Sequence, residues 1–135
     1  VSRYIDADQP TMVWGLPGIG KSDIVKQIAK ERGIALIDFR ASLRDPVDIR
    51  GLPLVDAKAG LSRWLPPAEL PDEKRHGKQG ILFLDEINAA MMAVQVALYG
   101  LVLDRYVGEY HLPKGWRIVA AGNDVTDKAG AQRMS

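Results

Sequence analysis

A stretch of eight residues near the start of the sequence could hold a chain of phosphate groups. The pattern G-x-x-x-x-G-K-[ST] is met in full by Gly15-Leu16-Pro17-Gly18-Ile19-Gly20-Lys21-Ser22. Glycines let the backbone fold into a concave turn whose N–H groups point inward, and a following helix adds its positive dipole end. Lys21 would attract the β- and γ-phosphates, and the Ser22 hydroxyl could bind Mg²⁺. The pattern therefore predicts a binding site for Mg²⁺ and ATP that extends from Gly15 to Asp23.

Two acidic residues follow the most continuous apolar run of the chain. Ile81-Leu82-Phe83-Leu84 is typical of a buried parallel strand, and Asp85 and Glu86 come directly after it. In open α/β sheets, ligands bind at the carboxyl ends of the strands. We expect Asp85 to hold Mg²⁺ through water, and Glu86 to orient and deprotonate an attacking water as a general base. The alternative is that the pair complements the dipole of the next helix.

The last predicted strand also ends in a polar residue. Trp116 to Ala121 is a buried strand in this interpretation, and Gly122 and Asn123 follow it. If this strand lies beside the acidic one, the Asn123 amide could hydrogen-bond the attacking water or the γ-phosphate. The alternative is an ordinary turn residue, because Gly-Asn-Asp is favourable turn chemistry.

The elements that position these residues follow from hydrophobic periodicity. Buried strands are predicted at 11–14, 34–39, 81–84 and 116–121, and helices at 22–32 and 88–103. A strand, a helix and a second strand in succession predict an α/β fold with a parallel sheet. Hairpins are expected at 51–65 and 106–112, a short helix at 45–50, a short helical turn that starts at 66–67 and a polar loop at 72–80.

The predicted helix at 88–103 is apolar on most of its faces. Its side chains are interpreted as core, with cover by a neighbouring subunit as the alternative for Met91, Met92, Val94, Val96, Ala97 and Leu98. Trp14 and Trp116 are expected to pack in or beside the sheet, whereas Trp64 and Tyr110 could be exposed. Neither His76 nor His111 has a partner at metal-ligand spacing, so neither is assigned a role.

Length and composition fit one domain over residues 1–135, with 47% hydrophobic and 26% charged residues. The absence of cysteine excludes disulfides and fits a cytoplasmic location. The net charge of +1 and the lack of a basic stripe make nucleic acid an unlikely partner, and the basic residues at 74–78 are interpreted as a solvated loop. No secretory signal is expected, and the longest apolar stretch, 89–103, is too short to span a membrane.

Three motifs in this order resemble those of the AAA+ ATPases, a family with the P-loop NTPase fold. The resemblance covers roughly residues 10–124 and identifies Walker A with Lys21 and Ser22, Walker B with Asp85 and Glu86, and sensor 1 with Asn123. The stretches 45–53, 64–67 and 103–113 resemble the MoxR branch, where a hairpin interrupts helix 2 and another precedes sensor 1. The resemblance implies a three-layer sandwich with a sheet in the order 5-1-4-3-2, and catalytic roles for Lys21, Glu86 and Asn123.

The resemblance also implies a function: Mg²⁺-dependent ATP hydrolysis that drives remodelling of a client protein by a homo-oligomeric ring, often a hexamer. The family continues into a helical lid, so the sequence is expected to be a C-terminally truncated core. Arg133 is a weak match to the family's arginine finger. Without lid and finger, we expect the chain to bind ATP better than it hydrolyses it. Two alternatives stay open: a nucleotide-sensing module with little turnover, and a nucleic-acid-directed P-loop ATPase.

Overall fold

Four parallel strands form the main sheet of the chain. The computed structural model describes the backbone of residues 11–15 and 21–123 and the side chains of residues 21–122. The strands are β1 (Thr11–Gly15), β2 (Ala35–Arg40), β5 (Gly80–Asp85) and β8 (Trp116–Asn123). They lie in the order β1-β8-β5-β2, and every pair is parallel. This confirms the α/β fold with a parallel sheet. When only these four strands are numbered along the chain, their order is 1-4-3-2, which matches that part of the expected order 5-1-4-3-2.

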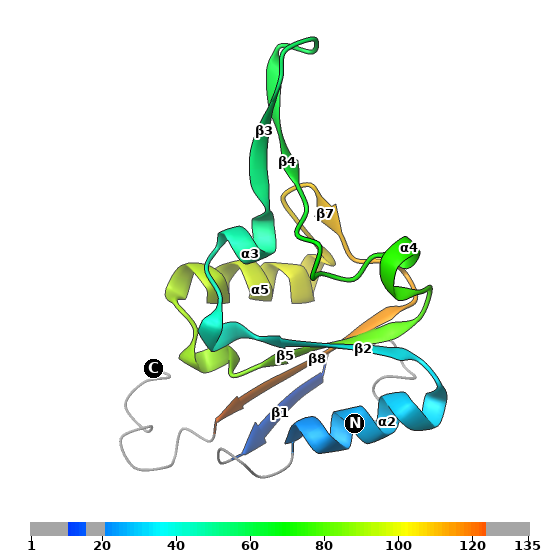
Figure 1. The fold of residues 1–135 in the computed structure, drawn as a ribbon. Helices are drawn as coiled ribbons and strands as arrows, with labels where there is room; N and C mark the ends of the chain where they lie inside the picture. Colours follow the sequence, from blue (N-terminus) through cyan, green and yellow to red (C-terminus); the bar gives the residue numbers. More distant parts are fainter. Residues whose placement is uncertain (1–10, 16–20, 124–135) are drawn as a thin grey trace.

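Helices cover both faces of this sheet, which gives the three layers that the resemblance implies (Figure 1). Helix α2 (Lys21–Arg32) buries Val25 and Ala29 against Ile81, Phe83 and Val119. The opposite face packs on α3 (Val47–Arg50) and α5 (Met92–Asp104), with a core that includes Phe39, Leu82, Leu84, Ile118, Leu98 and Leu101. Successive strand residues point to opposite faces, so both layers draw on the same strands.

Two antiparallel hairpins lie outside the main sheet, where the sequence predicts them. Strands β3 (Leu52–Asp56) and β4 (Leu61–Leu65) form a ribbon that projects from the body beyond α3 (Figure 1). Strands β6 (Tyr106–Val107) and β7 (Tyr110–His111) form the smaller hairpin between α5 and β8. The ribbon begins at Gly51, whose φ is +86° and where an added Cβ would lie 1.7 Å from the Leu65 carbonyl oxygen. Only glycine fits this position.

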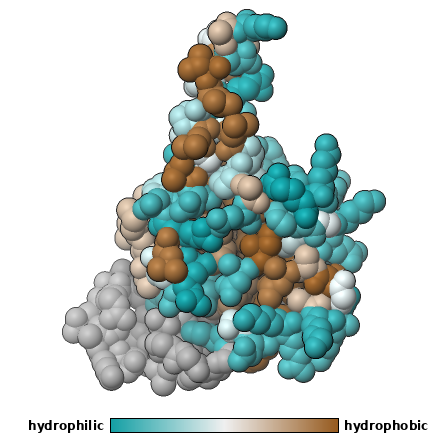
Figure 2. All heavy atoms as spheres, viewed as in Figure 1, coloured by the Kyte–Doolittle hydropathy of each residue, from teal (hydrophilic) through white to brown (hydrophobic). Residues whose placement is uncertain are grey.

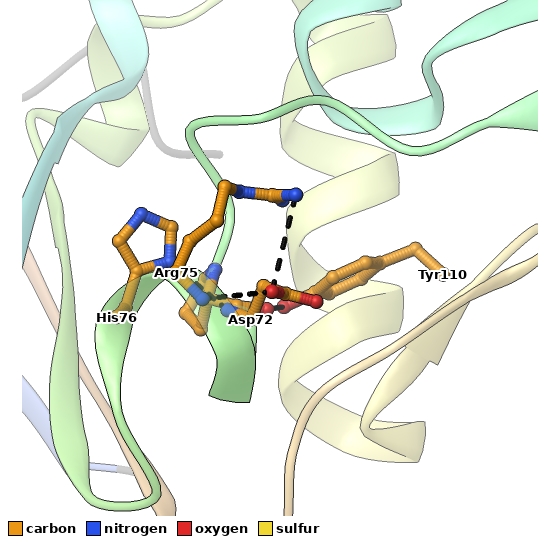
Figure 3. Close-up of polar contacts among 5 residues, drawn as sticks. Asp72, Arg75, His76 and Tyr110 are labelled. Carbon is orange, nitrogen blue, oxygen red and sulfur yellow. Dashed lines mark hydrogen bonds and ion pairs between the residues drawn. The ribbon is translucent and has the colours of Figure 1, made fainter.

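The segment expected to be a polar loop contains a short helix instead. Helix α4 (Glu73–His76) begins after Asp72, whose carboxylate accepts a hydrogen bond from the Arg75 N–H at 3.0 Å. The Asp72 N–H in turn donates to Nδ1 of His76 at 3.0 Å (Figure 3). This capping exchange stabilises one helical turn that hydrophobic periodicity does not reveal, because none of the helical residues is buried.

Several other local predictions are wrong. Residues 66–67 are not helical, and a turn follows them at 68–69. Two short 3₁₀ helices, η1 (Ala41–Leu43) and η2 (Ile87–Ala89), follow the ends of β2 and β5. Helix α5 therefore begins at Met92 rather than at Asn88. Tyr110 is buried, with its hydroxyl donating to the Pro71 carbonyl oxygen at 2.7 Å, and burial raises the pKa of this phenol (Figure 3).

The core interpretation of α5 holds for only part of the helix. Val94, Leu98 and Leu101 are fully buried, as a core helix requires. Met91, Met92 and Val96 are exposed, so the helix is apolar on a face that the described residues do not cover. Among the residues that the structure describes, no helix combines the length and hydropathy that a membrane span would need.

The contact between β5 and the start of β8 gives the first testable prediction. A Cβ added at Gly80 would lie 2.5 Å from the Trp116 ring, which is fully buried. Gly80→Ala should therefore lower the free energy of unfolding by about 1–3 kcal/mol through overpacking, measured by urea denaturation. The control is Gly100→Ala in α5, where an added Cβ meets nothing within 4 Å. This control should gain about 0.5–1 kcal/mol from helix propensity, and equal behaviour of the two variants would contradict the packing argument.

Candidate functional site

The predicted site residues come from the carboxyl ends of neighbouring strands. Gly15, the last residue of β1, pairs with Asn123, the last residue of β8. In the other half of the same sheet, Asp85 at the end of β5 pairs with Arg40 at the end of β2. Parallel strands end at the same edge, so the topology brings these positions together at the place where α/β sheets bind ligands.

Lys21 extends from the first residue of α2 to this edge. Its ammonium group donates a hydrogen bond to the Gly122 carbonyl oxygen at 2.9 Å. Gly122 precedes Asn123 in β8, so the amino-terminal end of α2 is fixed to the strand that carries the predicted polar tip. The positive end of the α2 dipole and the Lys21 charge therefore act at one point. Ser22 and Asp23 follow in the first turn of α2.

Asp85 is held in an environment that opposes its negative charge. Partial burial raises the pKa of Asp85 above its ordinary value of 3.8, and the carboxylates of Glu86 and Asp38 raise it further. A hydrogen bond from the Glu86 N–H to Oδ1 of Asp85, 2.8 Å long, and the charge of Lys21 act in the opposite direction. A carboxylate that lacks sufficient positive charge nearby is suited to bind a cation.

Glu86 adopts an uncommon backbone conformation and is held by two groups. Its φ and ψ are 55° and 38°, a left-handed conformation that costs a residue other than glycine about 1 kcal/mol or more. Ser42 donates its hydroxyl to Oε1 of Glu86 at 2.7 Å, and Nε of Arg40 lies 3.4 Å from the same oxygen. Both partners belong to the end of β2 and to η1, so the neighbouring strand determines where this carboxylate points.

Sequence reasoning did not identify the contribution of β2. Asp38 and Arg40 alternate with the buried Phe39 and therefore share the sheet face that α2 covers. Both residues line a hollow of about 440 Å³, together with Leu43 and Arg44. The signal in the sequence was the alternation of charged and apolar residues at the end of a strand.

Part of the predicted site lies outside the described residues. Leu16, Pro17, Gly18, Ile19 and Gly20 belong to this part, as does the weak arginine-finger match Arg133. Asn123 is placed by its backbone alone, beside Gly15. The structure thus brings together Lys21, Asp85 and Glu86, and leaves the roles of the loop glycines and of the Asn123 amide as predictions.

The environment of Asp85 predicts a measurable cost in stability. Because the pKa of Asp85 is higher in the folded than in the unfolded state, the ionised carboxylate opposes folding. The penalty develops as the pH rises from about 3.8 through the folded pKa, and it is complete above that value. Asp85→Asn keeps an oxygen for the Glu86 N–H and should raise the urea midpoint at pH 7 without nucleotide. The gain should shrink as the pH is lowered toward 4.

Asp38→Asn provides the graded comparison for this measurement. It removes one of the charges that raise the pKa of Asp85 and should therefore stabilise the protein in the same direction, by a smaller amount. A lower urea midpoint for Asp85→Asn than for the parent at pH 7 would contradict this description of the site.

Known proteins share the sequence pattern and the fold of this chain. Residues 11–99 match the model of the AAA family, the ATPase family associated with various cellular activities. Among solved structures, a candidate ATPase from Cytophaga hutchinsonii ATCC 33406 superposes with a TM-score of 0.63 at 19% identity, over 98% of this chain and 41% of the other. NtrX from Brucella abortus gives a TM-score of 0.61 at 18% identity, over 99% of this chain and 33% of the other.

These two likenesses support the fold, and in each case the chain spans less than half of the length of the solved protein. No curated protein matches the sequence. The family match extends from β1 into α5 and therefore includes Lys21, Asp85 and Glu86. The chain belongs to the AAA family of ATPases.

Proposed function

We propose that this chain, over residues 1–135, is the nucleotide-binding core of a MoxR-like AAA+ ATPase that binds Mg²⁺ and ATP and hydrolyses ATP. The observation that carries the proposal is the position of the Lys21 ammonium on the Gly122 carbonyl oxygen, at the sheet edge where Asp85 and Glu86 lie. A triphosphate at this edge would meet Lys21, the start of α2 and the N–H groups of the loop from Gly15 to Gly20.

The side chains present fit a magnesium site of the kind found with nucleotides. Mg²⁺ in such sites takes one or two protein oxygens and completes its shell with substrate phosphates and water. Among the described residues, no group of three or more His, Asp or Glu side chains forms a metal cage. Asp85 and Ser22 would hold the ion, which would neutralise charge on the phosphates.

Glu86 is the residue placed to act on water. It follows Asp85 directly in the chain, so its carboxylate belongs to the same strand end as the proposed magnesium ligand. A water molecule at this edge would be within its reach. The carboxylate would orient this water and accept its proton, and Lys21 with the loop amides would stabilise charge on the transferred group. Asn123, at the end of the neighbouring strand, would hydrogen-bond the same water or the γ-phosphate.

The MoxR-like assignment is supported by the two hairpins. The ribbon β3–β4 lies between β2 and β5, and the hairpin β6–β7 lies between α5 and β8. These are the positions at which the resemblance places the inserts of that branch. In this proposal the core works within a ring, often hexameric, that remodels a client protein.

One observation favours the alternative of a nucleotide sensor with little turnover. Ser42 and Arg40 both engage Oε1 of Glu86, and a carboxylate held in this way is less able to turn toward water. The nucleotide sensor and the ATP-hydrolysing core share the same binding site. They differ in how freely the Glu86 side chain can turn toward water.

Binding and hydrolysis can be separated with two substitutions. Lys21→Ala should weaken Mg·ATP binding by roughly 10- to 100-fold, because a charged hydrogen bond is worth about 1.5–3 kcal/mol. Glu86→Gln should leave the binding affinity intact and lower kcat by about 100-fold or more. Isothermal titration and steady-state phosphate release measure the two effects. Lys30→Ala, in the last turn of the same helix, is the matched control and should behave as the parent does. Equal affinity of Lys21→Ala and the parent would contradict the proposal.

The hold on Glu86 generates a separate prediction. Ser42→Ala removes a hydrogen bond to the carboxylate and should raise kcat several-fold, consistent with a bond of about 1 kcal/mol. The affinity for Mg·ATP should stay the same. Single-turnover hydrolysis by the parent, Ser42→Ala and Ser42→Thr measures the effect, since threonine keeps the hydroxyl. Equal rates for Glu86→Gln and the parent would favour the sensor alternative. Equal rates for Ser42→Ala and the parent would contradict the idea that this hydrogen bond restrains Glu86.

A further inference from the structure

The projecting β3–β4 ribbon meets the body of the molecule mainly through one side chain. Within its two strands only Asp56 and Trp64 are partly buried, and the other residues are exposed. The burial of Asp56 is local to the ribbon, because its carboxylate accepts from the Ala59 N–H at 3.1 Å and lies 3.4 Å from Nε of Arg63. Figure 2 shows the ribbon standing clear of the body, with apolar side chains along it. Trp64 is therefore the residue that relates the ribbon to the rest of the chain.

Two groups of the body hold Trp64. Its N–H donates to Oε2 of Glu109, in the turn between β6 and β7, at 2.5 Å. Its ring centre lies 5.2 Å from the Arg50 guanidinium at the end of α3. A hydrogen bond to a carboxylate is stronger than a cation–π contact at an exposed site. The Glu109 carboxylate is therefore the main attachment of the ribbon beyond its root.

The Trp64 ring is not packed tightly against the body. An apolar hollow of about 290 Å³ lies beside it, lined also by Pro46, Val47, Arg50, Gly51 and Pro53. Close-packed side chains fill space of this size in a protein interior. The hollow leaves room between the ribbon and α3, so packing of the ring does little to fix the angle of the ribbon.

The root of the ribbon is narrow. The chain enters β3 at Gly51 and leaves β4 at Leu65, and an added Cβ at Gly51 would lie 1.7 Å from the Leu65 carbonyl oxygen. Residues 66–67, which follow, belong to no helix or strand. Two crossings this close together keep the strands paired but allow the ribbon to turn as a unit. Hinges commonly consist of a few such residues at the end of an element.

We propose that the Glu109 carboxylate is a latch that fixes the angle of the ribbon, and that the ribbon swings about its root when this one hydrogen bond is broken. The latch belongs to the β6–β7 hairpin, which Arg105 joins to β8 by donating to the Pro113 and Trp116 carbonyl oxygens. The position of the ribbon is thus set from the central sheet and not from its own root. The inference does not rest on the proposed function, because it requires neither ATP binding nor hydrolysis.

The register of the ribbon supplies separate reporters for the latch and for the fold of the ribbon. In an antiparallel pair, hydrogen-bonded and non-hydrogen-bonded residue pairs alternate. Trp64 lies opposite Pro53, which has no N–H, and donates its own N–H to Glu109, so this pair is non-hydrogen-bonded. The adjacent pair, Leu54 and Arg63, then exchanges both of its hydrogen bonds within the ribbon. Its amides report whether the ribbon is formed, whereas the Trp64 amide reports the latch.

Amide hydrogen exchange without nucleotide tests the latch. In Glu109→Ala the Trp64 amide should exchange about tenfold faster or more, because a hydrogen bond to a charged group is lost. Glu109→Gln keeps a carbonyl oxygen, so its Trp64 exchange rate should lie between those of Glu109→Ala and the parent. The Leu54 and Arg63 amides should exchange as in the parent. The matched control is Glu31→Ala, which removes the same charge from α2, and it should leave all three rates unchanged.

A distance measurement tests the swing itself. The chain has no cysteine, so Lys58→Cys at the tip of the ribbon and Lys26→Cys on α2 can carry a pair of spin labels. Double electron–electron resonance should give one narrow distance distribution with Glu109 present. The distribution should become broader or displaced when Glu109→Ala is added, and Glu31→Ala should leave it narrow.

Three results would overturn the proposal. Unchanged Trp64 exchange in Glu109→Ala would show that this hydrogen bond does not hold the ribbon. An unchanged distance distribution would show that the root alone fixes the angle. Faster exchange of the Leu54 and Arg63 amides in Glu109→Ala would show that Glu109 is needed to form the ribbon, and not only to position it.

Discussion

The parallel pairing of β5 with β8 is the constraint on which the candidate site depends. These two strands occupy the centre of the sheet, and Gly80 to Leu84 are buried on both faces. Their register aligns Leu84 with Ala120, so Asp85 and the residues before Asn123 leave the sheet at the same edge. Glycine at position 80 gives the Trp116 ring room to close the opposite end of this pair. A shift of the register would separate Asp85 from the carbonyl that holds Lys21.

Strand β8 also connects the candidate site to the periphery of the molecule. The guanidinium of Arg105, at the end of α5, donates to the carbonyl oxygens of Pro113 at 3.0 Å and Trp116 at 2.9 Å. Arg105 thereby joins the base of the β6–β7 hairpin to the start of β8. That hairpin holds the ribbon through Glu109. The hydrogen bonds of Arg105 and Glu109 therefore connect the sheet that carries the candidate site with the projecting β3–β4 ribbon.

The sequence predicts those parts of this structure that depend on periodicity and on local chemistry. Strand β5 was predictable because a run of buried apolar residues ends in two acids. The phosphate-binding pattern from Gly15 to Ser22 stays a prediction, because residues 16–20 lie outside the described part of the chain. Helix α4 was not predictable, since a capping exchange between Asp72 and His76 stabilises it without burial. The buried position of Tyr110 depends on a carbonyl 39 residues away.

The partners of Glu86 were hidden for the same reason. Ser42 and Arg40 reach this carboxylate because β2 and β5 lie side by side, a proximity that spacing along the chain does not encode. The sequence contained the alternation of Asp38 and Arg40, which indicates a shared face, but only the sheet order shows what this face meets. Candidate site residues are thus easier to predict from the sequence than the groups that hold them.

This chain departs from ordinary folding chemistry in two places, at the sheet edge and on the outer surface. At the sheet edge, a partly buried Asp85 and a left-handed Glu86 lower the stability of the isolated fold. A cation between these acids and a triphosphate would remove the repulsion that raises the pKa of Asp85. On the outer surface, apolar area that water does not stabilise is exposed on the ribbon at Leu52, Leu54 and Leu65, and on α5 at Met92, Val96 and Leu103. A carboxylate without a nearby counter-charge is a cost that a bound cation would relieve. The sheet edge, where local rules fail, is therefore also the place where we propose that Mg²⁺ and ATP bind.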